Sequence, residues 1–169
     1  MGSPVFRRKI AAVAIAVATG FGLTVTAGTA SADTVTQTCY VNGSDIGRTV
    51  NVTITVPATV TRGVPVPVFL KVRDVKAWTG RPLGAGAVMG LGVIKTGGAG
   101  SGEFKVDRLT NPTAIPVGEH WYIEGTEQVA FTTPGTITLG LRMFGHPIYY
   151  GCSIPMGQEP PVAATVTVT

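Results

Sequence analysis

Few side chains in this chain are suited to nucleophilic chemistry. After position 32 the sequence contains only three serines, Ser44, Ser101 and Ser153, and two histidines, His120 and His146. A nucleophilic hydrolase needs a serine, cysteine or threonine beside a base, often on a sharp glycine turn. Ser101 lies between glycines but lacks the rest of that pattern, so the sequence favours a flexible tip there.

Metal, glycosidase and phosphate chemistry also lack their usual motifs. The histidines do not form an HExxH motif, so we expect no metal site. Asp107, Glu119, Glu124 and Glu127 could supply a carboxylate pair for glycoside cleavage, but acidic residues in turns and at exposed strand positions are usually solvated. The glycines of residues 84–92 are not followed by Gly-Lys-Thr, so we expect no phosphate cradle and no cofactor.

Aromatic side chains are the remaining candidates for a site. Trp78 and two adjacent pairs, Trp121–Tyr122 and Tyr149–Tyr150, could form a platform on which sugar rings or a protein partner stack. Neighbouring residues in a strand point to opposite faces, so one member of each pair is expected in the core. The outward member of each pair is where a binding surface is expected.

Two cysteines, Cys39 and Cys152, lie near the two ends of the sequence after position 32. In an exported chain they predict one structural disulfide. Closing a loop of about 100 residues is worth about 4.7 kcal/mol in the chain-entropy model. A reactive thiol or a pair of metal ligands is the competing interpretation, and the lack of any CxxC motif disfavours it.

The first 32 residues are predicted to be a secretory signal. Basic residues at 7–9 precede an apolar stretch at 10–27, and Ala30-Ser31-Ala32 predicts cleavage before Asp33. An uncleaved membrane anchor is the alternative, and the glycines and threonines of the stretch disfavour it. We therefore expect one domain over residues 33–169, secreted and extracellular, with no stable membrane anchor after cleavage.

The charge of the exported part excludes one class of partner. The whole chain has 13 basic and 9 acidic residues, a formal net charge of +4, and three of the basic residues lie in the leader. The remainder is close to neutral and has no run of lysine or arginine. Binding to nucleic acid or to an anionic membrane surface is therefore not expected.

The exported part is patterned for short strands. Residues 49–56 alternate apolar and polar side chains, and residues 64–72 repeat the pattern with Pro65 and Pro67 on the opposite phase, which predicts a start at a sheet edge. Residues 45–47 predict a hairpin turn. Further strand-like runs cover 103–109, 121–124, 128–131, 136–144, 148–152 and 164–168. About eight strands separated by glycine and proline turns predict an all-β fold, an antiparallel two-layer sandwich of immunoglobulin-like or related Greek-key type.

Residues 81–102 interrupt this pattern as a glycine-rich insertion. A short helix, an apolar strand and a packed loop are all open for it. Eight glycines argue against a helix, because each costs roughly 1 kcal/mol relative to alanine. We expect this segment to be the most mobile.

A series of turn and cysteine motifs covers most of residues 35–168. They are Thr38-Cys39-Tyr40, Val56-Pro57-Ala58-Thr59-Val60-Thr61-Arg62-Gly63, Thr133-Pro134-Gly135-Thr136-Ile137-Thr138-Leu139, Cys152 and Pro155-Met156-Gly157. In this order they resemble a group of uncharacterised secreted actinobacterial β-sandwich domains. The resemblance implies a cysteine-stapled sandwich without an assigned activity, and it supplies no catalytic residue. Residues 77–118 depart from it.

Together these features predict a secreted, non-enzymatic protein that binds a partner at or outside the cell surface, either a protein or a cell-wall polymer. One alternative is an envelope-active toxin or pore former, in which apolar residues 83–94 would enter a bilayer. Another is a hydrolase whose site has no recognisable motif.

Overall fold

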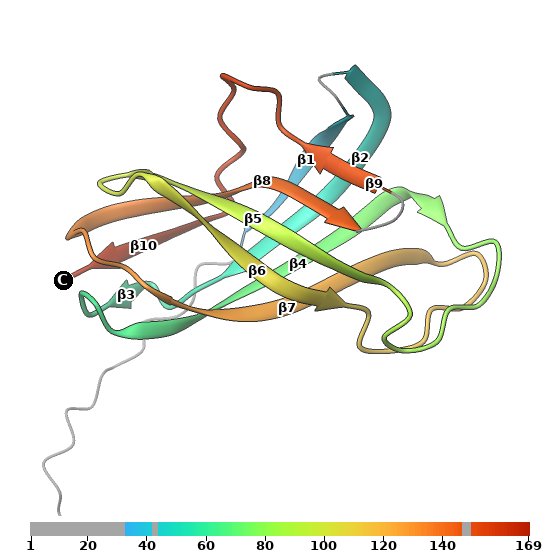
Figure 1. The fold of residues 1–169 in the computed structure, drawn as a ribbon, viewed down its shortest axis with the longest axis horizontal. Coiled ribbons are helices and arrows are strands. Elements are labelled where there is room, and N and C mark those ends of the chain that lie inside the picture. The colour runs from blue at the N-terminus through green and yellow to red at the C-terminus, as the bar shows by residue number, and fades with distance from the viewer. Residues whose placement is uncertain (1–32, 42–43, 147–149) are drawn as a thin grey trace, which may run out of the picture.

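The computed structural model describes residues 33–41, 44–146 and 150–169 (Figure 1). Within these ranges, the segments with alternating side chains form strands. The predicted leader and Tyr149 lie outside these ranges. Ten strands and no helix occur within them. The strands are β1 (Thr34–Val41), β2 (Ser44–Thr55), β3 (Thr59–Val60), β4 (Pro65–Trp78), β5 (Met89–Gly98), β6 (Gly102–Thr110), β7 (His120–Ala130), β8 (Gly135–His146), β9 (Tyr150–Ser153) and β10 (Ala164–Val168).

The strands join into one hydrogen-bonded sheet in the order β3-β10-β8-β5-β6-β7-β4-β2-β1-β9 (Figure 1). β9 also pairs with β8, so the strands from β8 round to β9 form a closed circuit. The pairing of β10 with β3 is parallel, and the other pairings are antiparallel. The predicted all-β class is confirmed. The strands are linked in one mixed sheet, so the prediction of two separate antiparallel sheets is not confirmed.

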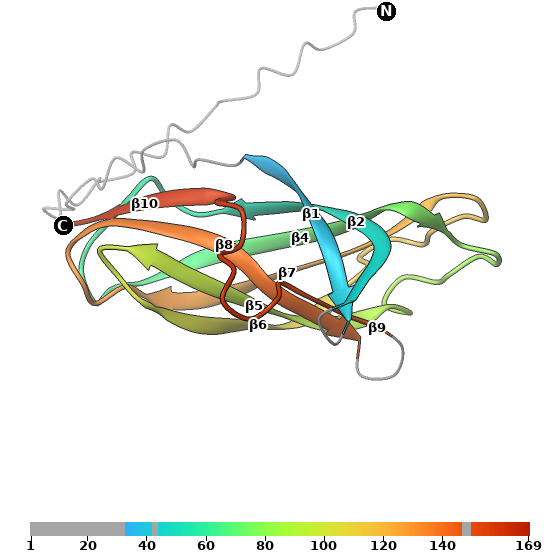
Figure 2. The same ribbon diagram turned by 90° about the horizontal axis from the view of Figure 1, so that it is seen from above.

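The core lies between strands that the curled sheet brings face to face. Figure 2 shows β5 and β6 opposite β2 and β4. Every second residue is buried over residues 50–54 of β2 and 68–72 of β4, as the alternation predicts: Val50, Val52, Ile54, Val68, Leu70 and Val72. A Cβ at Gly92 of β5 would collide with Leu70 Cδ2 of β4. Glycine at position 92 therefore allows this close approach.

The glycine-rich segment contributes a central strand of the sheet. Of the three alternatives open for residues 81–102, the apolar strand is the one adopted, over residues 89–98. This strand, β5, pairs with β6 on one side and with β8 on the other. The glycines allow close packing, because a Cβ at Gly90 would fall 2.8 Å from the carbonyl oxygen of Gly145.

Two boundaries differ from the sequence prediction. The predicted hairpin turn at residues 45–47 lies inside β2, beside a register shift in β1, and the Gly47 N–H donates to Asp45 Oδ1 at 2.7 Å. The two predicted runs at 121–124 and 128–131 form the single strand β7. Gly125 breaks the apolar pattern between them but packs closely, since a Cβ there would fall 3.0 Å from Leu109 Cδ2.

The predicted sheet edge at the start of β4 is present. Pro65 and Pro67 pair with β7, whereas the pairing of β4 with β2 begins only at Phe69. Proline cannot donate a ladder hydrogen bond, so it suits a stretch that has one partner strand.

The interior differs between the two ends of the sheet. At the end formed by β3, β10 and the start of β8, on the left of Figure 1, the buried residues include Val60, Phe131, Ile137, Val166 and Val168. We call this the apolar end. Toward the other end, Gln37 and Asp74 are each 1% exposed and lie on either side of Val50 in one row of paired residues. We call this the polar end.

Candidate functional site

The first aromatic pair divides between the core and the surface. The Trp121 ring packs against the core, with its centroid 6.0 Å from that of Phe144. Tyr122, the next residue of β7, lies on the outer face. This is the division that strand alternation predicts. Trp78 and Tyr150 belong to β4 and β9; because Tyr149 lies outside the described residues, the prediction for the second pair stays a prediction.

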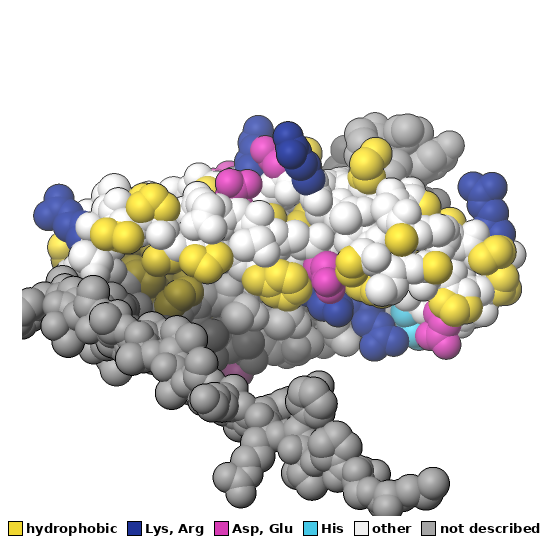
Figure 3. Space-filling model, turned by 90° about the horizontal axis from the view of Figure 1, so that it is seen from below, with side chains coloured by type: hydrophobic (Ala, Val, Ile, Leu, Met, Phe, Trp, Pro, Cys, Tyr) yellow, Lys and Arg dark blue, Asp and Glu magenta, His cyan; other side chains and the backbone are white. Residues whose placement is uncertain are grey.

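Tyr122 lines a groove of about 460 Å³ on the outer face of β4 and β7, which we call the Tyr122 groove. Lys71 and Arg73 enter it from β4, His120 from β7, and residues 114–116 from the preceding loop, together with Glu119. On the face drawn in Figure 3, a histidine side chain lies toward one end, with basic and acidic side chains near it, and other charged side chains are spread along the face. The groove thus combines an aromatic ring with charged groups of both signs.

The ring of Tyr122 is held from two sides. Its hydroxyl lies 2.6 Å from Thr113 Oγ1, and the Lys71 ammonium lies 4.6 Å from the ring centroid. Lys71 is itself positioned by Glu124, whose Oε2 lies 2.9 Å from Nζ. These contacts exist without a bound ligand, so the orientation of the Tyr122 ring is fixed before a ligand binds.

Asn111 positions the loop that carries Thr113. Its side chain is fully buried, and its amide nitrogen donates to the carbonyl oxygens of Gly84 and Thr113 at 2.7 and 2.9 Å. Its Oδ1 accepts from the Val88 N–H at 2.8 Å. One side chain therefore joins the loop after β6 to the loop before β5, and a bridge between Leu83 and Ile115 extends that link.

Two polar groups of the groove have no protein partner within the part of the chain that the structure describes. Arg73 is exposed, and its guanidinium makes neither an ion pair nor a hydrogen bond with the described residues. The Nδ1 atom of His120 is buried, and it too lacks a hydrogen-bond partner among them. A ligand in the groove can reach the exposed guanidinium of Arg73, whereas the His120 Nδ1 atom is shielded from it.

A second groove, of about 490 Å³, lies over β5 and β8 and is closed on one side by residues 159–162. Its surface is formed largely by glycines and hydroxyl groups. Its charges are already paired, since Lys95 Nζ lies 2.7 Å from Glu159 Oε1. Ser101 lines this groove, but no histidine among the described residues does. The groove lacks both the aromatic ring and the unpaired cation of the Tyr122 groove.

The residues weighed for metal or catalytic chemistry are placed as follows in the described ranges. No group of three His, Cys, Asp or Glu side chains suited to a metal ion occurs there. Glu124 is engaged by Lys71, and Ser153 Oγ donates to the Tyr40 carbonyl oxygen at 3.2 Å. Nor does that part of the chain contain a helix long and apolar enough to cross a membrane.

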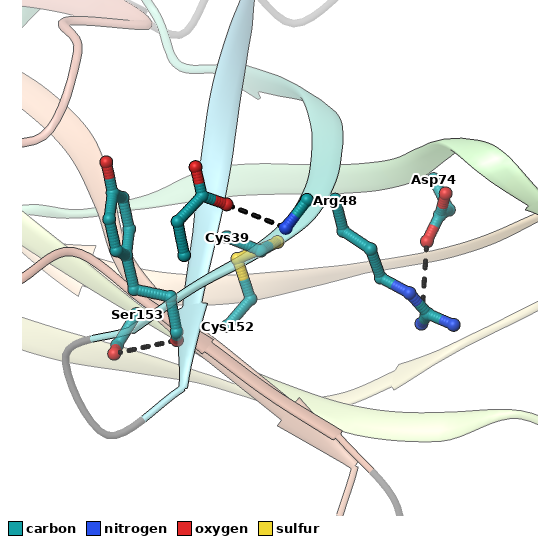
Figure 4. The surroundings of a disulfide bond; sticks show 8 residues. Cys39, Arg48, Asp74, Cys152 and Ser153 are labelled. Atoms are coloured by element: carbon teal, nitrogen blue, oxygen red, sulfur yellow. Dashed lines mark hydrogen bonds and ion pairs between the residues drawn. A yellow bond between two sulfur atoms is a disulfide. The ribbon is translucent and has the colours of Figure 1, made fainter.

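The predicted disulfide is confirmed, and it joins β1 to β9 (Figure 4). Cys39 and Cys152 are each 2% exposed. Beside them, the Arg48 guanidinium lies 4.0 Å from the carboxylate of buried Asp74. The disulfide is consistent with an oxidising, extracellular environment.

Comparison with known proteins found no match to the chain among family models, curated proteins or solved structures.

Sequence reasoning found Tyr122 but missed three residues that complete its site. Lys71 and Arg73 lie on the outer face of a strand that is predicted from the apolar residues of its inner face. Their phase is readable in the sequence, but the pairing of β4 with β7 is not. Asn111 is recognisable in the sequence only as part of an Asn-Pro turn, because nothing local indicates that its side chain is buried between two loops.

Proposed function

We propose that this protein is a secreted, non-enzymatic binding module and that the Tyr122 groove is its ligand-binding surface. One observation carries the proposal: an aromatic ring fixed by Thr113 and Lys71 stands beside the unpaired guanidinium of Arg73. Rigid aromatic rings and arginine are the side chains that most often dominate the free energy of binding. A ring already held in place loses little conformational freedom when a ligand binds.

The proposed partner is a protein or a cell-wall polymer at or outside the cell surface. The disulfide supports an extracellular setting. The grouping with secreted actinobacterial domains remains part of the proposal and supplies no ligand. The pore-former alternative is less well supported, because residues 89–94 belong to β5 and would have to leave pairings with both β6 and β8.

A sedimentation experiment with purified cell walls tests the proposal. The wild-type exported chain should bind insoluble walls of the producing cell, and Tyr122→Ala should weaken that binding at least tenfold, because it removes the ring from the groove. Phe69→Ala is the matched control. Phe69 is another half-buried aromatic residue of the same outer face, but it lies outside the groove.

The groove is supported as the binding surface if the wild type and Phe69→Ala bind cell walls and Tyr122→Ala does not. Equal binding by the wild type and Tyr122→Ala would contradict it. Far-ultraviolet circular dichroism of each variant confirms that the sheet is retained.

A further inference from the structure

Four outward residues form a row that crosses four neighbouring strands. Thr36 of β1 pairs with Asn51 of β2, Asn51 with Arg73 of β4, and Arg73 with Tyr122 of β7. Paired residues of adjacent strands lie on the same face, and strands are about 4.8 Å apart. The row is therefore about 14 Å long. We call it the cross-strand row.

Each residue of the row offers a different recognition group. Tyr122 provides a ring, Arg73 a guanidinium fork, Asn51 an amide and Thr36 a hydroxyl. Thr36 Oγ1 donates to Asn51 Oδ1 at 3.1 Å, so the Asn51 amide N–H groups remain available as donors. All four side chains are exposed or half-buried.

The charge of the row favours a ligand that carries a carboxylate. The adjacent row carries Lys71 and Glu124, which neutralise each other at 2.9 Å. Arg73 is then the cation left without a partner within the described part of this surface. A guanidinium binds a planar carboxylate through two parallel hydrogen bonds.

The spacing of the row favours a chain of sugars. The separation of adjacent strands is close to the length of one sugar ring in a polysaccharide, so successive sugars can lie over successive strands. The apolar face of a sugar suits the Tyr122 ring, and its hydroxyls suit the donors and acceptors of Asn51 and Thr36.

We propose that the cross-strand row binds a carboxylate-bearing polysaccharide that lies across β7, β4, β2 and β1. A carboxylate pairs with Arg73, a sugar ring packs on Tyr122, and the next sugars hydrogen-bond to Asn51 and Thr36. The inference rests on the proposed function, since it names the ligand class of the same surface.

Isothermal titration calorimetry with galacturonate oligomers tests this assignment. The tetramer should bind the exported chain, and its fully methyl-esterified form, which keeps the sugars but lacks the negative charges, should bind at least tenfold more weakly. Arg73→Gln should cause a similar loss for the acidic tetramer. Lys105→Gln, which removes an exposed charge from β6 outside the groove, should leave the affinity unchanged.

A second experiment tests whether the bound polysaccharide crosses the strands. Asn51→Ala should weaken binding of the tetramer but not of the dimer, because the dimer is too short to span from Tyr122 to Asn51. Equal losses for both lengths would overturn the crossing orientation.

The failure of this inference can be told apart from failure of the proposed function. Equal binding of the acidic and esterified tetramers, full affinity in Arg73→Gln, or no tetramer binding would overturn the carboxylate assignment. Tighter binding of a poly(glycerol phosphate) chain through Arg73 would overturn it too. If Tyr122→Ala still abolishes wall binding in those cases, the proposed function stands. If it does not, both fail.

Discussion

At the apolar end of the sheet, buried apolar side chains such as Ile137 and Val168 form part of the hydrophobic core, and the outer surface carries little of the proposed site. At the polar end, Gln37 and Asp74 occupy interior positions, and the chain there relies on a disulfide and on the hydrogen bonds of Asn111. The cross-strand row lies on the outer face of this second end, since Thr36 adjoins Gln37 and Arg73 adjoins Asp74.

Packing and recognition are thus separated along the same strands. Apolar burial contributes most of the free energy of folding, at about 25 cal/mol per Å². Apolar burial is least complete at the polar end, and that end carries the fixed polar groups that a ligand can contact. Four substitutions or pairs of substitutions test this contrast, and their effects should decrease in the order disulfide, Ile137, Asn111 and Gln37.

Replacing both Cys39 and Cys152 by alanine should have the largest effect. The disulfide closes a loop with a sequence separation of 113 residues. Its loss should lower the free energy of unfolding by about 4.7 kcal/mol, because the unfolded chain gains freedom. Urea denaturation of the variant and of the wild type measures the difference. A change below about 1 kcal/mol would show that the polar end does not depend on its covalent link.

Ile137→Ala should destabilise the apolar end by about 3 kcal/mol, since it leaves a cavity in a well-packed interior. Ile137 is 3% exposed, and its Cδ1 lies 3.0 Å from where a Cβ would stand on Gly100. Binding at the Tyr122 groove should persist below the unfolding transition, which cell-wall sedimentation can check. Loss of binding in a folded Ile137→Ala protein would contradict the separation of the two ends.

Asn111→Ala should cost about 2 kcal/mol, because it removes a fully buried side chain and its hydrogen bonds to the Val88 N–H and to the carbonyl oxygens of Gly84 and Thr113. Unlike Ile137→Ala, it should also weaken ligand binding, since Thr113 would no longer be held beside Tyr122. Denaturation and sedimentation are measured on the same preparation. Unchanged binding would mean that the loop keeps its position without Asn111.

Gln37→Met should have the smallest effect, either none or a gain of up to about 1 kcal/mol. Both polar side-chain atoms of Gln37 are buried without a hydrogen-bond partner in the described chain, and methionine has a similar volume. Gln37→Glu is the matched control and should destabilise the protein, because it buries a charge. A loss above about 1 kcal/mol in Gln37→Met would show that the amide is paired.

The strands were predictable where side-chain alternation is regular. Residues 164–168 form β10 with the predicted bounds, and the buried face of residues 49–56 follows the predicted phase. β5 stayed ambiguous because its glycines hide the pattern, and their role depends on how closely Leu70 and Gly145 approach. Such contacts join distant parts of the chain, and no local pattern encodes them.

The site was predictable only in part for the same reason. Alternation placed either Trp121 or Tyr122 outward but could not choose between them, because the choice depends on which face of β7 meets the core. Arg73 became a candidate only once β4 and β7 were seen to pair. The aromatic half of the site was therefore accessible from the sequence, and the charged half was not.

The position of the disulfide also determines how the protein responds to mechanical load. Cys39 lies near the start of the residues that the structure describes and Cys152 near their end. A force pulling on both termini would therefore pass through the covalent link and bypass the strands enclosed between them. Only the first residues of β1 and the segment that carries β10 could be peeled away. A domain tethered at both ends would keep β4 and β7, and with them the Tyr122 groove, intact under tension.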